Sequence, residues 1–306
     1  MKIYVAGHRG LVGQALSREI ESTELHEWCG ASRSDLDLLD KGQIRQFVGD
    51  TKPDAVIIAA AKVGGIGANA SHPVDFLTEN LIIELNLMAI AHEFDIKNLL
   101  FLGSSCIYPK YSDQPIKESA LLTGALEPTN EAYAIAKIAG IKLVQGYRKQ
   151  FGRKWISAMP TNLYGPGDNF DLETSHVLPA MIAKFHHAKT TGKSEVVLWG
   201  TGSAYREFLH VDDLAKACLL LLETYNSETA INVGTGKDIR IIELAKMIRE
   251  IVGFGGEVVW DSTKPDGTPR KLLNTELIES LGWRPNIELF EGITSVYQSY
   301  KDNSKP

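Results

Sequence analysis

Short apolar, β-branched runs alternate with patterns typical of helices through the first 160 residues of this 306-residue chain. Parallel strands need long crossover connections, and a repeated strand-then-helix order supplies them. The pattern therefore predicts an α/β fold with a doubly wound parallel sheet of the Rossmann type. Strands are expected at residues 2–6, 27–32, 55–59, 98–103 and 155–160, and helices at 11–22, 41–51, 74–94 and 133–151.

The regular order ends near residue 165, where the cluster Gly165-Pro166-Gly167-Asp168 interrupts it. A helix is still expected at 177–189, with loops at 199–203 and 264–269. We expect residues 1–165 to form a first domain, to whose sheet residues of about 207–236 return. A smaller α/β substrate-binding lobe is expected from residues of about 166–206 and 237–306.

The composition excludes several classes of protein. A net charge of −6 and the absence of a strongly basic block argue against a nucleic-acid or anionic membrane surface. No apolar run approaches the roughly 18 residues of a membrane span, and the first strand leaves no room for a signal peptide. Cys29, Cys106 and Cys218 are too widely spaced for a disulfide framework or a zinc site. We expect a cytoplasmic protein without a bound metal.

A glycine-rich stretch separates the first expected strand from the first expected helix. Glycines here permit a tight turn and the close approach of a pyrophosphate, whose charge the helix N-terminus attracts. The Gly-x-x-Gly-x-x-Gly spacing differs from the Gly-x-Gly-x-x-Gly fingerprint of many dehydrogenases. Its place in a βαβ unit nevertheless predicts a dinucleotide site formed by Gly7, His8, Arg9, Gly10, Leu11, Val12 and Gly13.

The second expected strand indicates which dinucleotide binds. It runs into Arg33, where NAD sites commonly carry an acidic residue for the ribose 2′-hydroxyl. Arg9 and Arg33 together suit a 2′-phosphate, because guanidiniums bind phosphate in a forked geometry. NADP is therefore favoured over NAD, although Arg33 is alternatively a solvated loop charge. Asp37 and Asp40 follow, and either reach the adenine or cap the next helix.

Hydroxyl and thiol side chains follow the apolar run at 99–102. Ser104 and Cys106 stand at the expected carboxyl end of a buried strand, where α/β sheets bind ligands. Tyr133 and Lys137 are spaced i, i+4 on one face of a helix. A nearby ammonium stabilises phenolate, so we expect the pKa of Tyr133 to be lowered. Ser104, Tyr133 and Lys137 would then form a carbonyl-reduction site in which Tyr133 protonates the oxygen. By itself Tyr-x-x-x-Lys is more often a surface pair.

Longer runs carry a resemblance that covers the chain nearly end to end. Together with the glycine turn, Ser104 and the Tyr133/Lys137 pair, they resemble the GDP-L-fucose synthase family of extended short-chain dehydrogenase/reductases. The runs are AAAKVGGI at 59–66, GSSCIYPK at 103–110, EPTNE at 127–131, MPTNLYGP at 159–166, REFLHVDD at 206–213 and KPDGTPRK at 264–271.

The resemblance implies a bifunctional enzyme that epimerises GDP-4-keto-6-deoxy-D-mannose at C3 and C5, then reduces the 4-ketone with NADPH to give GDP-L-fucose. Protons beside a ketone are removable because the enolate's charge falls on the carbonyl oxygen, which Tyr133 and Ser104 can hydrogen-bond. Inversion needs a proton from the opposite face. The family uses the cysteine and histidine that match Cys106 and His176 as this acid/base pair. The alternatives are a packed thiol and a helix cap.

The resemblance also implies binding residues and an assembly. Lys184, Trp199, Arg206 and Asp266 match substrate positions of the family; the alternatives are that Trp199 closes the lobe and that Arg206 pairs with Asp212 or Asp213. The family pairs helices equivalent to 74–94 and 133–151, so a homodimer is expected. Further cofactor contacts are expected from Leu102, Gly103, Ser105, Lys137, Pro160, Asn162, Leu163 and His176.

Other functions stay open at this point. A colitose-type synthase acting on a GDP-linked 3,6-dideoxy ketosugar would need almost the same site. A 4-epimerase or 4,6-dehydratase that retains its cofactor is a further alternative, but Ser105-Cys106 lacks the carboxylate that dehydratases usually carry beside the serine. A non-catalytic dinucleotide sensor would not need Ser104, Tyr133 and Lys137.

Overall fold

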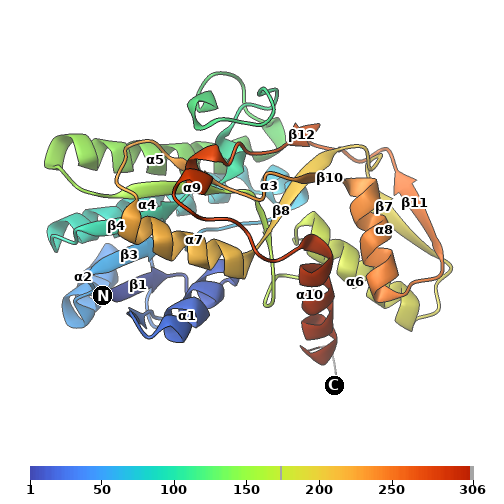
Figure 1. Ribbon diagram of the computed structural model, residues 1–306, viewed down its shortest axis with the longest axis horizontal. Coiled ribbons are helices and arrows are strands. Elements are labelled where there is room, and N and C mark those ends of the chain that lie inside the picture. Colours follow the sequence, from blue (N-terminus) through green and yellow to red (C-terminus); the bar gives the residue numbers. More distant parts are fainter. Residues whose placement is uncertain (173, 304–306) are drawn as a thin grey trace.

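Within residues 1–172 and 174–303, which the structure describes, six parallel strands form the main sheet of the computed structural model (Figure 1). Their order is β2-β1-β3-β4-β5-β9. The carboxyl ends of these strands therefore meet along one edge, which is the ligand-binding edge of such sheets. The strands are β1 (Lys2–Ala6), β2 (Glu27–Cys29), β3 (Ala55–Ile58), β4 (Asn98–Leu102), β5 (Ile156–Pro160) and β9 (Ile231–Val233).

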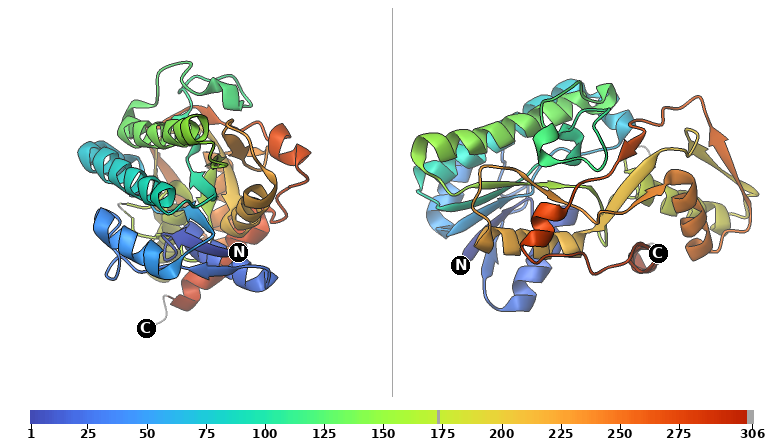
Figure 2. Two further views of the ribbon diagram at one scale, coloured as in Figure 1. Left: turned by 90° about the vertical axis from the view of Figure 1, so that its left-hand side faces the viewer. Right: turned by 45° about the horizontal axis from the view of Figure 1, so that its top comes forward.

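Helices cover both faces of this sheet (Figure 2). Side chains alternate across a strand, so Ile3 and Val5 pack toward one helical layer while Tyr4 and Ala6 pack toward the other. All four are buried, which explains why the strands read as continuous apolar runs. One layer is α1 (Leu11–Thr23) with α7 (Val211–Thr224); the other is α2 (Lys41–Thr51), α4 (Pro73–Glu93) and α5 (Glu131–Phe151).

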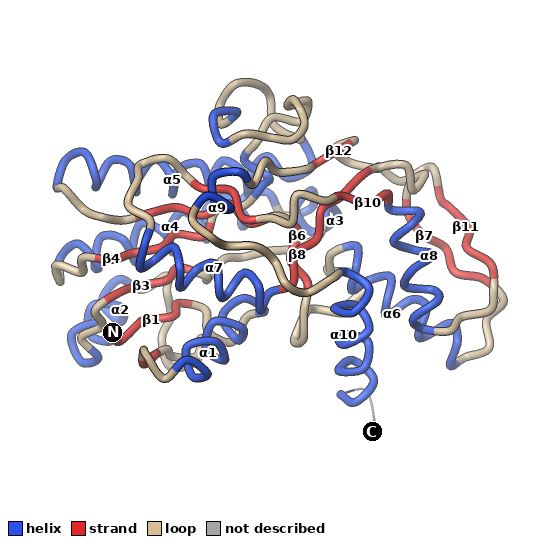
Figure 3. The backbone as a smooth tube through the Cα atoms, viewed as in Figure 1, coloured by secondary structure: helices blue, strands red, loops and turns tan. Residues whose placement is uncertain are grey.

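A smaller half lies beside the main sheet, to its right in Figure 3. Its second sheet has the order β10-β8-β12, with β6 also paired to β8, and β7 pairs with β11 separately. Its apolar core lies between three helices and these strands. The elements are β6 (Asn162–Tyr164), α6 (Val177–Thr190), β7 (Glu195–Trp199), β8 (Tyr205–His210), β10 (Asp238–Arg240), α8 (Ile241–Val252), β11 (Glu257–Asp261), β12 (Arg270–Lys271) and α10 (Leu289–Asn303).

The doubly wound parallel sheet expected from the sequence is confirmed, with differences at the ends of elements. The strand expected at 27–32 ends at Cys29, because its pairing with β1 extends no further than Tyr4 and Cys29. The expected return of residues 207–236 to the main sheet is wrong for β8, which pairs with β6, β10 and β12 instead. The short helices α3 (Ile66–Ser71) and α9 (Glu276–Ser280) were not predicted. No described helix combines the length and apolar character that crossing a membrane requires.

A glycine allows α5 to approach α4 and the main sheet closely. A Cβ atom placed on Gly140 would lie 2.4 Å from Cζ of Phe101 and 2.7 Å from Oε2 of Glu84. Carbon atoms pack no closer than about 3.5 Å, so a side chain at this position must push the helix away. Lys137 lies one turn earlier on α5, so this contact also sets the height of Lys137 above β4.

Two glycines of α5 provide a matched test of this contact. Gly140→Ala is expected to lower the free energy of unfolding by about 1–3 kcal/mol, because the added methyl overpacks the contact. The methyl group of Gly146→Ala would extend into open space. This substitution is expected to raise the free energy of unfolding by roughly 0.5–1 kcal/mol, because alanine is the better helix former. Urea denaturation measures both. Equal effects of the two substitutions would contradict the close packing.

Candidate active site

The turn after β4 carries Ser104 and Cys106 into the ligand-binding edge of the sheet. Ser104 begins a short 3-10 helix (Ser105–Ile107), and its Oγ accepts a hydrogen bond from the backbone N–H of Cys106 at 3.3 Å. Leu102, Gly103 and Ser105 are buried, whereas the side chains of Ser104 and Cys106 are partly exposed. The turn therefore presents one hydroxyl and one thiol to the space above the strand.

Helix α5 brings Tyr133 and Lys137 to the same place. Ser104 hydrogen-bonds the phenol of Tyr133, and the Lys137 ammonium lies 5.9 Å from the centre of the Tyr133 ring. The Lys137 ammonium is also 3.1 Å from Oε1 of Glu84 on α4, and both of these side chains are only 2% exposed. The three groups predicted for carbonyl reduction thus lie together, and Glu84 is a fourth.

The expected lowering of the Tyr133 pKa is wrong for this structure. Burial raises the pKa of Tyr133, and the charges that Cys106 and Glu84 carry when ionised raise it further. The hydrogen bond with Ser104 acts in the opposite direction but is the smaller effect. Lys137 does not lower the pKa because its ammonium is paired with Glu84. In this state the phenol is a proton donor rather than a base.

Two N–H donors point at the sulfur of Cys106. The Asn130 amide lies 3.3 Å from Sγ, and the Lys271 ammonium lies 3.7 Å from it. Asn130 precedes α5, and Lys271 ends β12 in the smaller half. Cys106 is therefore a contact point between the two halves of the molecule, which is not the environment of a thiol packed in an apolar core.

His176 occupies the N-cap position of α6, but its side chain makes no capping hydrogen bond, which removes the helix-cap alternative. The imidazole is exposed to solvent, although many protein atoms lie around it. The resulting loss of solvation and the nearby Lys271 charge lower the pKa of His176. Lys271 is thus electrostatically coupled to His176 and in contact with the sulfur of Cys106.

The glycine turn has the geometry that a dinucleotide site requires. Gly7 has φ +90°, and a Cβ atom there would lie 2.8 Å from Ala60 backbone atoms. A Cβ on Gly13 would lie 2.1 Å from the Gly7 oxygen. A Cβ atom on Gly10, in contrast, would have no neighbouring atom closer than 3.4 Å, so the packing of the chain does not require a glycine there. The amino end of α1 has no side-chain cap, which leaves its N–H groups for an anion.

Other residues predicted for the cofactor surround this turn. Arg9 and Arg33 are both exposed, and they follow the adjacent strands β1 and β2. Asp40 caps α2 by accepting the N–H groups of Gly42 and Gln43, so the capping interpretation is confirmed for it. Asp37 accepts the Leu39 N–H at 3.0 Å. Also near the turn or the end of β5 are His8, Leu11, Val12, Pro160, Asn162 and Leu163.

The residues predicted to bind substrate lie in the smaller half. Trp199 is 50% exposed, and the Lys184 and Lys264 ammonium groups lie 6.0 and 5.4 Å from the centre of its ring. Burial lowers the pKa of Lys184, whose ammonium donates to the Val197 carbonyl at 3.0 Å. The exposed indole and its two flanking cations are therefore available to an aromatic or anionic ligand.

The side chain of Arg206 contacts the backbone of Asp266. The Arg206 guanidinium donates to the Asp266 carbonyl at 3.1 Å, and the Asp266 carboxylate accepts two hydrogen bonds from Thr201. The alternative pairing of Arg206 with Asp212 or Asp213 is wrong, because Asp212 pairs with Arg18 instead and Asp213 accepts backbone N–H groups.

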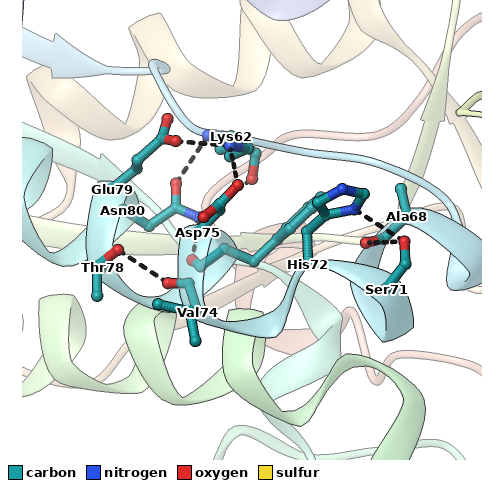
Figure 4. A network of polar contacts seen from close by, with 10 residues as sticks. Lys62, Ala68, Ser71, His72, Val74, Asp75, Thr78, Glu79 and Asn80 are labelled. Atoms are coloured by element: carbon teal, nitrogen blue, oxygen red, sulfur yellow. Dashed lines mark hydrogen bonds and ion pairs between the residues drawn. The ribbon is translucent and has the colours of Figure 1, made fainter.

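A polar network anchors the loop that borders the site between β3 and α3 (Figure 4). The Lys62 ammonium pairs with Asp75 at 3.1 Å and with Glu79, and its backbone N–H donates to Asn80 at 2.8 Å. The following Gly65 lies so close to Ser175 that a Cβ atom would be 2.7 Å from its oxygen. The network thus fixes a loop that holds the segment next to His176.

The model of the NAD dependent epimerase/dehydratase family matches residues 3–234, about three quarters of the chain. The chain belongs to this family. GDP-L-fucose synthase 1 of Arabidopsis thaliana is 55% identical over 99% of this chain and 94% of its own length, which places the chain in the GDP-L-fucose synthase branch. GDP-L-colitose synthase of Yersinia pseudotuberculosis is 41% identical over 98% of both chains.

Solved structures of the family have the same fold. A GDP-6-OMe-4-keto-L-xylo-heptose reductase from C. jejuni has a TM-score of 0.94 and 35% identity, and covers 99% of this chain and 98% of its own. A GDP-L-fucose synthetase from Naegleria fowleri, solved with NADP bound, has a TM-score of 0.91 and 28% identity over 99% of this chain and 94% of its own.

Three residues of the site, Asn130, Lys271 and Glu84, were not predicted from the sequence. Asn130 and Lys271 lie inside two of the runs that carried the resemblance, EPTNE and KPDGTPRK. An asparagine before a helix is typical of an N-cap, which hid its contact with Cys106. Glu84 lies in the middle of α4 and has no local signal, although a carboxylate in an otherwise apolar helical stretch would have been one clue.

Proposed function

We propose that the chain epimerises GDP-4-keto-6-deoxy-D-mannose at C3 and C5 and reduces the 4-ketone with NADPH, yielding GDP-L-fucose. The observation that carries the proposal is the meeting of Ser104, Cys106 and Tyr133 at the carboxyl end of β4. The turn after β4 supplies the Ser104 hydroxyl and the Cys106 thiol, and α5 adds the Tyr133 phenol beside them. The identity to a GDP-L-fucose synthase over the whole chain supports this substrate.

The residues of the glycine turn fit an NADP cofactor, which supplies hydride when bound. The uncapped amino end of α1 and the open space at Gly10 accept the diphosphate. Arg9 and Arg33 bind the 2′-phosphate, because their exposed guanidiniums stand on neighbouring loops. The half built on the main sheet is therefore the cofactor-binding domain, and residues 166–206 and 237–306 form most of the substrate lobe.

Tyr133 and Ser104 bind the ketone oxygen in the reduction step. Burial keeps Tyr133 protonated, so its phenol donates to the ketone oxygen and passes its proton to the alkoxide as that forms. Ser104 supplies the second hydrogen bond to the same oxygen. The Lys137 ammonium lies 5.9 Å from the centre of the Tyr133 ring, and its pairing with Glu84 leaves the phenol protonated until the ketone oxygen takes the proton.

Cys106 and His176 exchange the protons in the epimerisation step. The enolate oxygen is held by the same two hydroxyl groups, so one binding mode serves both reactions. Cys106 lies two residues beyond Ser104, and the His176 side chain makes no capping hydrogen bond to α6. These positions suit one group on each side of the sugar ring.

The remaining contacts bind the nucleotide half of the substrate. Arg206 and Lys184 bind the diphosphate, since both are cations that backbone carbonyls hold in place. Trp199 stacks on the guanine, as an exposed indole flanked by two lysines allows. Asp266 acts mainly by holding this loop, because its carboxylate is engaged with Thr201.

We further propose that the protein is a homodimer in the cytoplasm. The outer faces of α4 and α5 expose apolar side chains that a second copy would cover, namely Val74, Ile82, Leu85 and Ile135. The reduced state of the three cysteines agrees with a reducing compartment.

An activity assay tests the main proposal. Purified protein supplied with GDP-4-keto-6-deoxy-D-mannose is expected to consume NADPH, followed by the loss of nicotinamide absorbance, and to yield GDP-L-fucose on product analysis. The 3,6-dideoxy ketosugar linked to GDP serves as the competing substrate. Faster turnover of the dideoxy sugar would make the chain a colitose-type synthase, and folded protein that oxidises no NADPH would overturn the proposal.

Arg33→Ala is expected to discriminate between the two dinucleotides. Loss of the guanidinium removes about 1.5–3 kcal/mol of charge-assisted hydrogen bonding to the 2′-phosphate, so the Kd for NADPH rises roughly tenfold to a hundredfold. The Kd for NADH changes little, because NADH has no 2′-phosphate. Fluorescence titration measures both constants. Equal losses for the two cofactors would show that Arg33 does not contact this phosphate.

A further inference from the structure

Two helices of the site begin with side chains that do not cap them. Asparagine is among the best N-cap residues, because its side chain accepts the free N–H groups of the first turn. Asn130 stands at the N-cap position of α5 but makes no capping hydrogen bond. Its amide donates to Cys106 Sγ at 3.3 Å instead, and its Oδ1 is buried without a partner among the described residues. Asn130 therefore contacts the Cys106 thiol instead of capping α5.

The second donor to the sulfur comes from the other half of the molecule. Lys271 pairs directly with Arg206 across β12 and β8, so both side chains are on one face of the second sheet. The neighbouring Arg270 is on the opposite face, where it pairs with Asp238. Within the described residues no carboxylate lies within ion-pairing distance of Lys271, and its closest polar partner is Cys106 Sγ at 3.7 Å.

We propose that Lys271 and Asn130 are positioning residues that hold Cys106 as a thiolate, which makes it the base of the epimerisation. A sulfur that accepts an amide N–H and an ammonium N–H is arranged for the charged form, because the thiolate is the stronger acceptor. Neither residue has an assigned role in the proposed function on which this inference rests. The inference adds what makes the thiol a base.

Thiolate Sγ takes the proton from a carbon beside the ketone, forming an S–H bond, and the C–H electron pair passes into the enolate. His176, as imidazolium, then gives its N–H proton to the opposite face of that carbon, and the ketone reforms. Solvent takes the proton from the thiol and returns one to the imidazole.

Other charged groups face the same sulfur. Arg206 on β8 is coupled to Cys106 and favours the thiolate as Lys271 does. Tyr133 on α5 is coupled to it as well, and a phenolate there would oppose a thiolate. Because burial keeps Tyr133 neutral, no phenolate charge opposes the thiolate near neutral pH. Lys271 is the one in hydrogen-bonding contact, so its removal is the sharpest test.

Alkylation by iodoacetamide measures the thiolate directly and needs no substrate. Lys271→Met is expected to slow the labelling of Cys106 about tenfold at pH 7, the change that 1.4 kcal/mol of lost thiolate stabilisation produces. The half-point of the labelling rate moves to higher pH. Lys271→Arg restores most of the rate because it keeps the charge. Cys29 in the same sample, resolved by peptide mass spectrometry, labels at an unchanged rate.

A matched control and a second readout complete the experiment. Lys237→Met, which removes an exposed lysine paired with Glu288, leaves the labelling of Cys106 unchanged. With GDP-4-keto-6-deoxy-D-mannose and NADP⁺ in deuterated water, Lys271→Met lowers the kcat of deuterium incorporation at C3 and C5. Unchanged labelling of Cys106, or a rise in KM with kcat intact, would overturn the role of Lys271. If Lys271→Met slows the labelling of Cys106 but the unmodified protein incorporates no deuterium at C3 or C5, the Lys271–Cys106 contact is supported and only the proposed function is overturned.

Discussion

The buried ion pair between Lys137 and Glu84 determines where the other groups of the site lie. Both side chains are 2% exposed, so neither charge has water to stabilise it. A buried pair contributes little net stability, but loss of one partner leaves an uncompensated charge at a cost of about 3–5 kcal/mol. The pair therefore fixes α5 against α4 more than it strengthens the fold. Gly140, one turn further on, allows the close approach that the pair needs.

The same pair decides how Tyr133 behaves. With its ammonium held by Glu84, Lys137 leaves the buried phenol protonated, and a protonated phenol is what the reduction of a ketone requires. The proposed epimerisation then needs another group as its base, and we assign this role to Cys106. In the proposed function, each of the two reactions on one ketone has its own proton carrier, while Ser104 and Tyr133 bind the oxygen in both.

Sequence alone predicts the main sheet well, because strands buried on both faces read as continuous apolar runs. It does not predict the second sheet, whose strands are short and partly exposed and pair residues from 162 to 271. Tyr133 and Lys137 could be predicted from their spacing, but the direction in which the Tyr133 pKa shifts could not. That direction depends on the contact between Lys137 and Glu84, which lies 53 positions earlier in the sequence. Lys271 reaches Cys106 only through the pairing of β12 with β8.

The separation of the two proton carriers is tested most directly with Cys106→Ser in deuterated water. The variant is given GDP-4-keto-6-deoxy-D-mannose and NADPH, and NADPH oxidation and deuterium at C3 and C5 are followed together. If Cys106 serves only the epimerisation, deuterium incorporation falls at least about a hundredfold, the usual scale of a general base, while NADPH is still oxidised. Full incorporation of deuterium at both carbons would contradict this account and reduce the thiol to a packing residue.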